Sequence, residues 1–445
     1  MSLLTGPILP TLLRLAAPNV LAMTMAVAVG VAETRYVGLL GTTPLAAMAL
    51  VFPFAMLVQM MSAGAMGGGV SSAIARALGA GDRARAQTLA VHALVIGALT
   101  GAVTMALLLA LGPRFYHWLG GEGVVLQAAV GYATVVFLAV IPVWLVNTLA
   151  SVLRGTGDMR VPSVTLLVMA LVQIAVGGVC GLGLGPVPGL GMPGIALGQL
   201  VATVGGVLFL LWWLMSGRAR IRLVPRAVRL EAELFQDILK VGALACLSPL
   251  QSVLTMLIFT GLIARLGVAP LAGYGIGQRL EFMLIPVAFG IGVASVPMVG
   301  MAIGAGDVQR ARRVAWTAAT VSAVLLGLLG ALVCAVPDLW AARFTQDPAV
   351  LESARQYLRW VGPAFGAFGF GLTLYFAAQG SGRILGPVLA TTLRLLLVAA
   401  VGAGLAAHEA SAEAYFMLVA GAMVVYGAAT ALAVAMTRWG YSTRR

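Results

Sequence analysis

The chain consists of long apolar runs that carry almost no charge and are separated by short polar connections. A helix that crosses a bilayer needs about 20 mostly apolar residues, because its backbone polar groups must all be hydrogen-bonded within the segment. Only 9% of the side chains are charged, whereas soluble domains carry about 25%. The runs therefore predict an all-α integral membrane protein and exclude a soluble enzyme.

Measured against that length, the apolar runs predict twelve transmembrane helices. Their predicted ranges are 12–39, 45–75, 88–112, 124–152, 161–183, 193–216, 238–265, 270–302, 314–336, 349–378, 387–407 and 413–437. Several spans contain a proline, including Pro142, Pro249 and Pro363. Proline removes a helical hydrogen bond, so we expect kinks at some of these positions.

The basic residues predict the orientation of the helices. The chain has a net charge of +13, and most of its 27 basic residues fall at the two ends and in alternate connections. Short cytoplasmic loops collect Lys and Arg, so we expect both termini in the cytoplasm and the protein in the cytoplasmic (inner) membrane. Topology thus accounts for the charge, and we expect no nucleic-acid partner.

An internal repeat relates the two halves of the chain. GAGD at residues 79–82 recurs at 304–307, and RGTG at 154–157 recurs as QGSG at 379–382, both with an offset of 225 residues. Leu-Gly at 40–41 recurs at 266–267. Repeats with an even number of spans share one topology. We therefore predict an N-lobe (1–216), a cytoplasmic linker (217–237) and a C-lobe (238–445), the lobes being six-helix bundles related by a pseudo-two-fold axis along the membrane normal.

Motifs for enzymatic chemistry and for an ATP-driven motor are missing from the sequence. The single lysine, Lys240, follows Leu239 and so cannot complete a phosphate-binding Gly-Lys-Ser/Thr motif. His92, His117 and His408 are isolated from one another, as are the three cysteines. We therefore expect neither an enzyme nor a metal site.

Two acidic residues, Glu33 and Glu281, lie well within predicted spans, one in each half. A charge inside the membrane costs at least ~2.5 kcal/mol and marks a functional site by default. Antiport requires at least one group that can hold either a proton or a cation, and a carboxyl group can do so. The alternative is a structural ion pair with Arg35 or Arg279, although a spacing of two residues places each arginine on a different helix face.

Amide side chains accompany Glu33 in the first half. Gln59, Asn147, Gln173 and Gln199 all fall inside predicted spans. Such amides can orient a carboxyl group and offer oxygen ligands to a cation. Alternatively, they form structural hydrogen bonds between helices.

The chain resembles the multidrug and toxic compound extrusion (MATE) transporters over nearly its whole length. The resemblance is carried by LLRLAAP at 12–18, ETRYVG at 33–38, LGAGD at 78–82, the 153–162 loop, GLGMPG at 189–194, RLE at 279–281 and QGSGR at 379–383. It implies two six-helix lobes around a central cavity, and export of organic, often cationic, compounds in exchange for protons or sodium. It also places Glu33, Asn147, Gln173 and Gln199 at the N-lobe cation site.

The sequence departs from the family where many members bind sodium. Gly177 stands where a second acid is common, and the family's acids in helices 7 and 10 are replaced by Gln251 and by Tyr375 and Gln379. Sodium prefers charged oxygen ligands, so these departures favour proton coupling through Glu33 over sodium coupling. Beyond the coupling ion we expect no cofactor.

We accordingly predict a monomeric efflux antiporter in the lipid bilayer, with a small, cationic and amphipathic substrate. Its predicted coupling residues are Glu33 and Glu281, and its predicted binding residues are Asn147, Gln173, Gln199, Gln251, Tyr375 and Gln379. The alternative is a flippase or exporter of a lipid-linked or amphipathic substrate on the same two-lobe plan. A channel or a membrane enzyme fits the paired intramembrane carboxyl groups less well.

Overall fold

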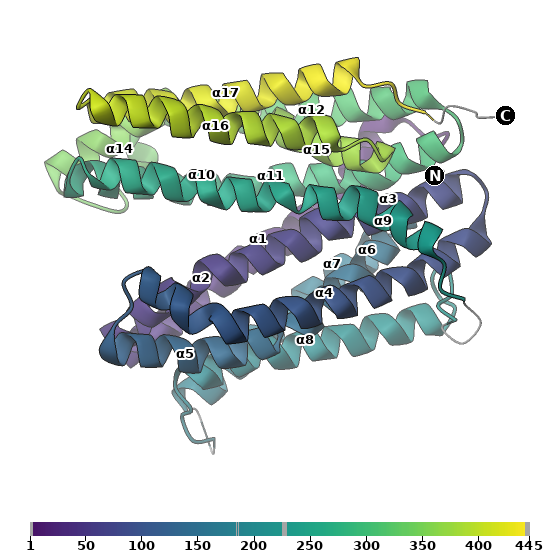
Figure 1. The fold of residues 1–445 in the computed structure, drawn as a ribbon, viewed down its shortest axis with the longest axis horizontal. Coiled ribbons are helices and arrows are strands. Elements are labelled where there is room, and N and C mark those ends of the chain that lie inside the picture. Colours follow the sequence, from purple (N-terminus) through teal and green to yellow (C-terminus); the bar gives the residue numbers. More distant parts are fainter. Residues whose placement is uncertain (1–2, 184, 186, 225–228, 441–445) are drawn as a thin grey trace. The chain divides into compact units, whose positions relative to one another are not determined.

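The computed structural model describes residues 3–183, 185, 187–224 and 229–440, and every regular element within them is a helix (Figure 1). Twelve of the helical spans are long and apolar enough to cross a membrane, which confirms the predicted number and the all-α class. The spans are α1 (Ile8–Leu40), α2, η1 and α3 (Thr42–Gln59, Met60–Met66, Gly67–Gly79), α4 (Arg83–Trp118), α5 and α6 (Gly123–Leu138, Val140–Gly155), α7 (Arg160–Leu182), α8 (Met192–Met215), α9 and α10 (Ala232–Ala245, Leu247–Ala264), α11 (Val268–Gly304), α12 (Val308–Ala335), α14, η3 and α15 (Pro348–Val361, Gly362–Ala364, Phe365–Ser381), α16 (Leu385–Ala407) and α17 (Ala412–Met436). The short α13 (Asp338–Ala341) lies in a connection.

Four spans are interrupted by a change in helix geometry. Pro142 closely follows the break between α5 and α6, Pro249 closely follows the break between α9 and α10, and Pro363 lies within the 3-10 turn η3. Each proline lacks the N–H that would pair with the carbonyl four residues earlier. The fourth interruption, η1, is a π-helical segment, a geometry that occurs often at functional sites.

The sequence repeat corresponds to repeated local structure. Asp82 accepts a hydrogen bond from the backbone N–H of Arg85 at 2.8 Å and caps α4, and Asp307 accepts one from Arg310 at 2.9 Å and caps α12. The glycine before each aspartate is left-handed, with φ of +79° and +80°. Equivalent turns thus begin equivalent helices in the two halves.

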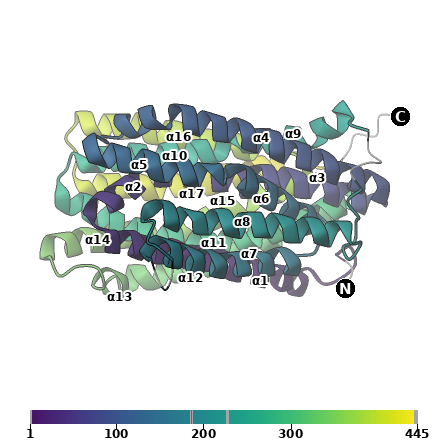
Figure 2. The same cartoon turned by 90° about the horizontal axis from the view of Figure 1, so that it is seen from below.

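The chain forms two compact units, whose helices run alongside one another within each unit (Figures 1 and 2). Unit 1 consists of residues 1–20 and 244–445, and unit 2 of residues 21–243. Relative to the predicted lobes, the first 20 residues go with the second half of the chain. The predicted linker and the first part of the seventh span go with the first half, and α9 begins inside that linker. Residues 225–228 of the predicted linker lie outside the described part.

Hydrogen bonds explain why the first residues belong to unit 1. The guanidinium of Arg310 donates to the backbone carbonyls of Leu3, at 3.0 and 3.2 Å, and Gly6, at 2.6 Å. Arg312, on the same helix, donates to the carbonyl of Thr437 at 2.8 Å. Both ends of the described chain are therefore held at the start of α12.

Polar contacts likewise fasten α9 to unit 2. Arg85 of α4 forms ion pairs with Glu233, at 3.2 Å, and with Asp237. The fully buried His92 accepts a hydrogen bond at Nε2 from the backbone N–H of Glu231 at 2.9 Å. These contacts fix the start of the seventh span against α4.

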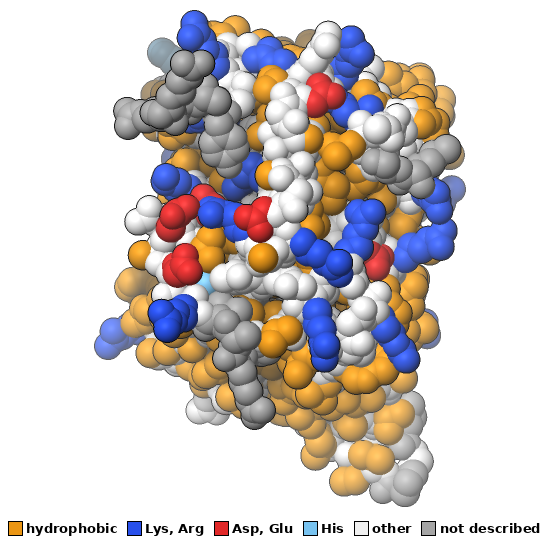
Figure 3. All heavy atoms as spheres, turned by 90° about the vertical axis from the view of Figure 1, so that its right-hand side faces the viewer, with side chains coloured by type: hydrophobic (Ala, Val, Ile, Leu, Met, Phe, Trp, Pro, Cys, Tyr) orange, Lys and Arg blue, Asp and Glu red, His pale blue; other side chains and the backbone are white. Residues whose placement is uncertain are grey.

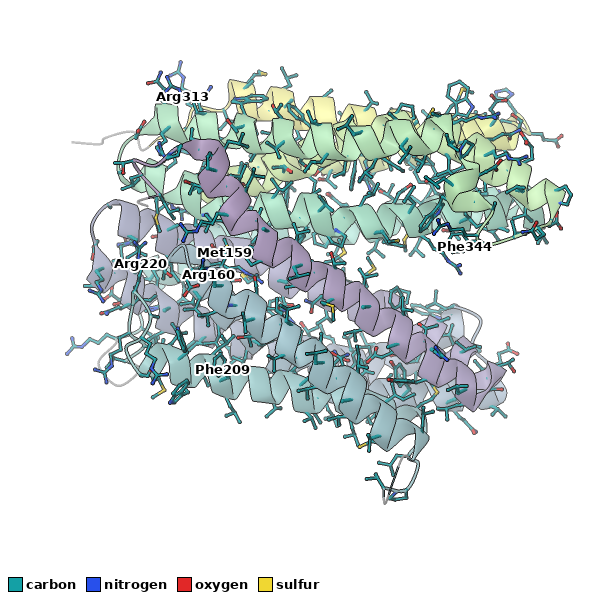
Figure 4. All side chains as sticks on the ribbon, turned by 180° about the vertical axis from the view of Figure 1, so that it is seen from behind. Met159, Arg160, Phe209, Arg220, Arg313 and Phe344 are labelled. Carbon is teal, nitrogen blue, oxygen red and sulfur yellow. The ribbon has the colours of Figure 1, made fainter. Side chains whose placement is uncertain are left out.

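Lys and Arg side chains are conspicuous on the face at which the chain ends lie (Figure 3). Arg220 donates to the carbonyl of Thr156 at 3.0 Å, close to the start of α7 at Arg160 (Figure 4). Thr156 follows the last residue of α6, so Arg220 binds at a helix C-terminus, where the partial negative charge of the helix favours a cation.

Candidate functional site

Glu33 lies in the part of α1 that belongs to unit 2, and it is partly buried there. Gln173 of α7 donates a hydrogen bond from Nε2 to Oε1 of Glu33 at 2.8 Å. The structure therefore brings together two residues that the sequence predicted as one site. A charge-assisted bond of this kind is stronger than a bond between neutral groups.

Close packing of α7 on α8 fixes the position of Gln173. A Cβ atom on Gly198 would lie 2.5 Å from the carbonyl oxygen of Gln173, and one on Gly194 would lie 2.3 Å from that of Cys180. Only glycine permits so close an approach of two backbones. Gln199 follows Gly198 on α8, but among the described residues its side chain makes no hydrogen bond to Glu33 or Asn147.

Tyr132 of α5 is a neighbour of Glu33 that the sequence analysis missed. It is buried and interacts electrostatically with the Glu33 carboxyl group. The sequence indicated its importance only through the repeat: Tyr132 lies 225 residues before Tyr357, which hydrogen-bonds to Glu281 in the other unit. Glu33 thus has both an amide donor and an aromatic neighbour.

Asn147 belongs to a second polar cluster of unit 2, at the π-helical segment η1. Its Nδ2 donates to Ser62 Oγ at 2.8 Å and to Gln59 Oε1 at 3.4 Å. Ser62 in turn donates to the carbonyl of Val58 at 2.8 Å. Asn147 and Ser62 are both buried, whereas Gln59 is exposed. The sequence predicted the two amides, but nothing in it revealed η1 or the role of Ser62.

Glu281 lies in unit 1 on the face of α11 that packs against α14, and Tyr357 Oη donates a hydrogen bond to its Oε1. Gly273, Gly277 and Glu281 follow one another at intervals of four residues, so they share a helix face. A Cβ atom on Gly277 would lie 2.1 Å from Tyr357 Cδ1. Glycine at this position therefore lets the Tyr357 ring reach the glutamate.

The cation near Glu281 is Arg394 of α16, not Arg279. Arg394 interacts electrostatically with Glu281, and its guanidinium lies 5.5 Å from the centre of the Tyr426 ring. The guanidinium of Arg279 instead lies 5.5 Å from the ring of Phe344, which is labelled in Figure 4. Glu281 therefore sits among a tyrosine hydroxyl and a guanidinium inside unit 1.

The remaining predicted residues of the second half form two groups around the seventh span. Gln251 Nε2 donates to Thr392 Oγ1 at 2.7 Å. Tyr375 Oη donates to the backbone carbonyl of Ala245 at 3.0 Å, and the side chains of Gln379 and Ser248 also interact with the Tyr375 hydroxyl. The structure thus joins Tyr375 to Gln379 and pairs Gln251 with a threonine of α16.

Oxygen and nitrogen groups in these clusters come mainly from amides and hydroxyls. Within the described ranges, no group of three or more His, Cys, Asp or Glu side chains could hold a metal ion. Glu33 has a neutral amide donor, whereas Glu281 has both a neutral hydroxyl donor and a positive charge nearby.

A family model described as MatE matches residues 18–179 and 245–405, which together make up most of the chain. Among curated proteins, a "FAD transporter" of Shewanella oneidensis is 25% identical over 405 residues, covering 89% of this chain and 87% of its own length. A "Probable multidrug resistance protein NorM" of Thermotoga maritima is 23% identical over 385 residues, covering 86% and 82%. The "Multidrug export protein MepA" of Staphylococcus aureus is 22% identical over 382 residues, covering 85% and 83%.

Solved structures share the fold over nearly the whole chain. A MOP superfamily transporter from Pyrococcus furiosus, described as having a binding pocket of reverse polarity, aligns with a TM-score of 0.90 and 23% identity, covering 98% of this chain and 96% of that one. A MATE structure in complex with MaL6 aligns with a TM-score of 0.89 and 24% identity, covering 98% and 97%.

Proposed function

This chain belongs to the MatE family, the multidrug and toxic compound extrusion transporters, and we propose that it exports organic cations in exchange for protons by alternating access. The family match confirms the resemblance inferred from the sequence motifs. The twelve apolar helices and the family indicate a multi-pass membrane protein of a transporter family. The coupling ion, the substrate and the residues that bind them form the proposal.

The observation that carries the proposal is the Glu33 carboxyl group, held by Gln173 at 2.8 Å beside Tyr132. The ionised carboxylate accepts the amide hydrogen bond and attracts a cationic substrate. When a proton neutralises the carboxylate, that attraction is lost and the substrate can leave. One group therefore binds the two species alternately, as antiport requires.

Glu281 is the weaker candidate for coupling, because unit 1 already supplies it with partners. Tyr357 donates a hydrogen bond to it, and Arg394 provides a positive charge. A carboxylate with a counter-charge of its own has less need of an external cation. We assign coupling to Glu33 and a supporting role to Glu281.

Asn147, Gln173 and Gln199 are the proposed ligands for substrate or cation in unit 2. Gln251 contributes an amide in unit 1, where it donates to the Thr392 hydroxyl, and an amide and a hydroxyl offer sodium no charged oxygen. This ligand chemistry supports protons over sodium. The proposal places the monomeric protein in the cytoplasmic membrane with both termini in the cytoplasm, in keeping with the distribution of its basic residues.

The relative described as a FAD transporter favours a second candidate, which is export of an anionic dinucleotide. Such a substrate would need guanidinium groups within the spans rather than a carboxylate. Arg394 is one cation placed inside unit 1. A flippase for an amphipathic or lipid-linked anion would share this requirement.

Proteoliposomes distinguish these functions. The wild type, Glu33→Gln and Glu281→Gln would be reconstituted and loaded with ethidium or with FAD, and efflux would be followed under an imposed pH gradient or sodium gradient. Glu122→Gln is the matched control, because Glu122 is an exposed residue before α5 whose side chain does not cap the helix.

We expect ethidium efflux that is driven by the pH gradient, abolished by Glu33→Gln and unchanged by Glu122→Gln. Efflux driven by sodium, or retained in full by Glu33→Gln, would refute proton coupling through Glu33. Efflux of FAD without efflux of ethidium would establish the second candidate.

A further inference from the structure

The seventh span is broken in the middle, where α9 ends at Ala245 and α10 begins at Leu247. Pro249 explains the break, because it has no N–H to donate to the carbonyl four residues earlier, which is that of Ala245. The boundary between the two compact units, at residues 243 and 244, lies in the last turn of α9. The break is therefore next to the point at which this span passes from one unit to the other.

The carbonyl that Pro249 leaves without a helical partner is the one that Tyr375 binds. Tyr375 Oη donates to Ala245 O at 3.0 Å, and both residues are buried, with 5% and 0% of their surface exposed. An unpaired carbonyl inside a membrane protein is costly, since no water can reach it. The tyrosine hydroxyl thus replaces the hydrogen bond that proline removed.

The same solution occurs at a second proline of unit 1. Pro363 frees the carbonyl of Arg359, and Cys334 Sγ of the neighbouring α12 lies 3.4 Å from that oxygen as a donor. In both spans, a side chain from another helix completes the hydrogen bonding of a proline break. The recurrence indicates that the Tyr375 contact belongs to the architecture of the break.

Tyr375 has little remaining capacity to bind an ion. A phenol hydroxyl donates one hydrogen bond and accepts through its lone pairs. The donor is used by Ala245, and the side chains of Gln379 and Ser248 also interact with the Tyr375 hydroxyl. A cation at this oxygen would have to compete with partners that are already in place.

We propose that Tyr375 is a positioning residue that holds the break in the seventh span by binding the Ala245 carbonyl released by Pro249, and that it is not a ligand of the transported ion. If the two units move during transport, this break has to keep its geometry while the span connects them. Loss of the hydroxyl then slows the conformational step and leaves substrate affinity unchanged. This transport consequence rests on the proposed function, whereas the structural role does not.

A double-mutant cycle on the purified full-length protein tests the structural role. Tyr375→Phe keeps the ring but leaves the carbonyl unpaired, and we expect thermal unfolding about 2–4 °C below that of the wild type. Pro249→Ala restores an N–H that can bind the Ala245 carbonyl, so Tyr375→Phe should have little effect in that background. Pro249→Gly restores the same N–H and serves as a second background if the alanine variant does not fold.

Tyr415→Phe, which removes a tyrosine hydroxyl from α17, is the matched control and should have the same effect with and without the Pro249→Ala substitution. A Tyr375→Phe effect of undiminished size in both the Pro249→Ala and Pro249→Gly backgrounds would overturn the proposal. The same is true of a sodium-dependent rise in the unfolding temperature of the wild type that Tyr375→Phe abolishes, because that result would make Tyr375 an ion ligand.

Transport kinetics provide a second measurement, which a change in stability alone would leave unaltered. With ethidium as the probe, we expect Tyr375→Phe to lower turnover about fivefold, the rate equivalent of one ordinary hydrogen bond, at unchanged KM. Turnover should recover when Pro249→Ala is added. A raised KM at unchanged turnover would contradict the proposal. Failure of every variant, wild type included, to move ethidium would refute the proposed cation export while leaving the stability cycle to decide the role of Tyr375.

Discussion

Tyr132 and Tyr357 occupy equivalent positions in the sequence repeat, and each lies beside the intramembrane glutamate of its own unit. Tyr357 donates a hydrogen bond to Glu281, whereas Tyr132 interacts electrostatically with Glu33, whose hydrogen bond comes from Gln173. The glutamates themselves are not repeat-related, since Glu33 is on the first span and Glu281 on the eighth. The repeat has thus kept the aromatic neighbour while the carboxylate stands on a different helix in each unit.

This difference predicts that removing the Tyr357 hydroxyl mainly lowers stability, whereas removing the Tyr132 hydroxyl mainly alters transport. Tyr357→Phe removes the donor to a partly buried carboxylate, so we expect the free energy of unfolding to fall by about 1.5–3 kcal/mol, with KM for substrate unchanged. Tyr132→Phe should lower the unfolding temperature less and alter transport more. Thermal unfolding and liposome efflux of the two variants, measured side by side, give the comparison. A larger stability loss for Tyr132→Phe would show that Glu33 is the structural carboxylate.

The Asn147 cluster yields a prediction about binding. Ser62→Ala removes an acceptor of the Asn147 amide, which then keeps Gln59 at 3.4 Å as its side-chain partner. We expect the amide to lose its fixed orientation and substrate affinity to weaken about fivefold, the equivalent of one hydrogen bond. Equilibrium binding of ethidium to the purified variant measures this change. Ser216→Ala, at an exposed serine after α8, is the control and should bind like the wild type.

The twelve spans could be predicted from the sequence because each is long enough to be identified by its own apolar residues. Glu33 and Glu281 were equally accessible, since a carboxylate stands out in an apolar run. Their partners were not, because Gln173 lies 140 residues from Glu33 and Tyr357 lies 76 residues from Glu281. No local pattern encodes a contact at such separation. The π-helical geometry at Ser62 also depends on tertiary packing rather than on local propensity.

His92 illustrates the same limit and supplies a third prediction. In the sequence it is an isolated histidine, but in the structure Nδ1 faces the carbonyl of Thr88 at 2.8 Å and Nε2 faces the N–H of Glu231 at 2.9 Å. The carbonyl can only accept and the amide can only donate, so a neutral ring protonated on Nδ1 satisfies both. His92→Leu leaves both groups unpaired and should destabilise the protein by about 1–3 kcal/mol.

Thermal unfolding of His92→Leu and His117→Leu checks this prediction. His117 is exposed, and the contact of its ring with the carbonyl of Gly121 is long at 3.4 Å. Its replacement should change the unfolding temperature little. Equal effects of the two substitutions would mean that the His92 contacts do not hold α9 to α4.

The packing of α14 on α11 leads to the fourth prediction, for which the chain provides its own control. A methyl group on Gly277 would lie 2.1 Å from Tyr357 Cδ1, whereas one on Gly275, two residues earlier in the same helix, would meet nothing within 4 Å. Gly277→Ala should therefore displace the Tyr357 ring and cost about 1–3 kcal/mol of stability. Gly275→Ala should be neutral or slightly stabilising, because alanine has the higher helix propensity.

Combining Gly277→Ala with Tyr357→Phe tests whether the clash acts through the bond to Glu281. If the displaced ring has already lost Glu281, the double variant should be little less stable than Gly277→Ala alone, since the hydroxyl has nothing left to contribute. Additive losses would mean that the ring keeps the glutamate and that the helices separate instead. Gly277→Ala and Tyr357→Phe both change unit 1 alone. If either variant keeps its stability but loses proton-driven efflux, Glu281 takes part in the coupling step together with Glu33.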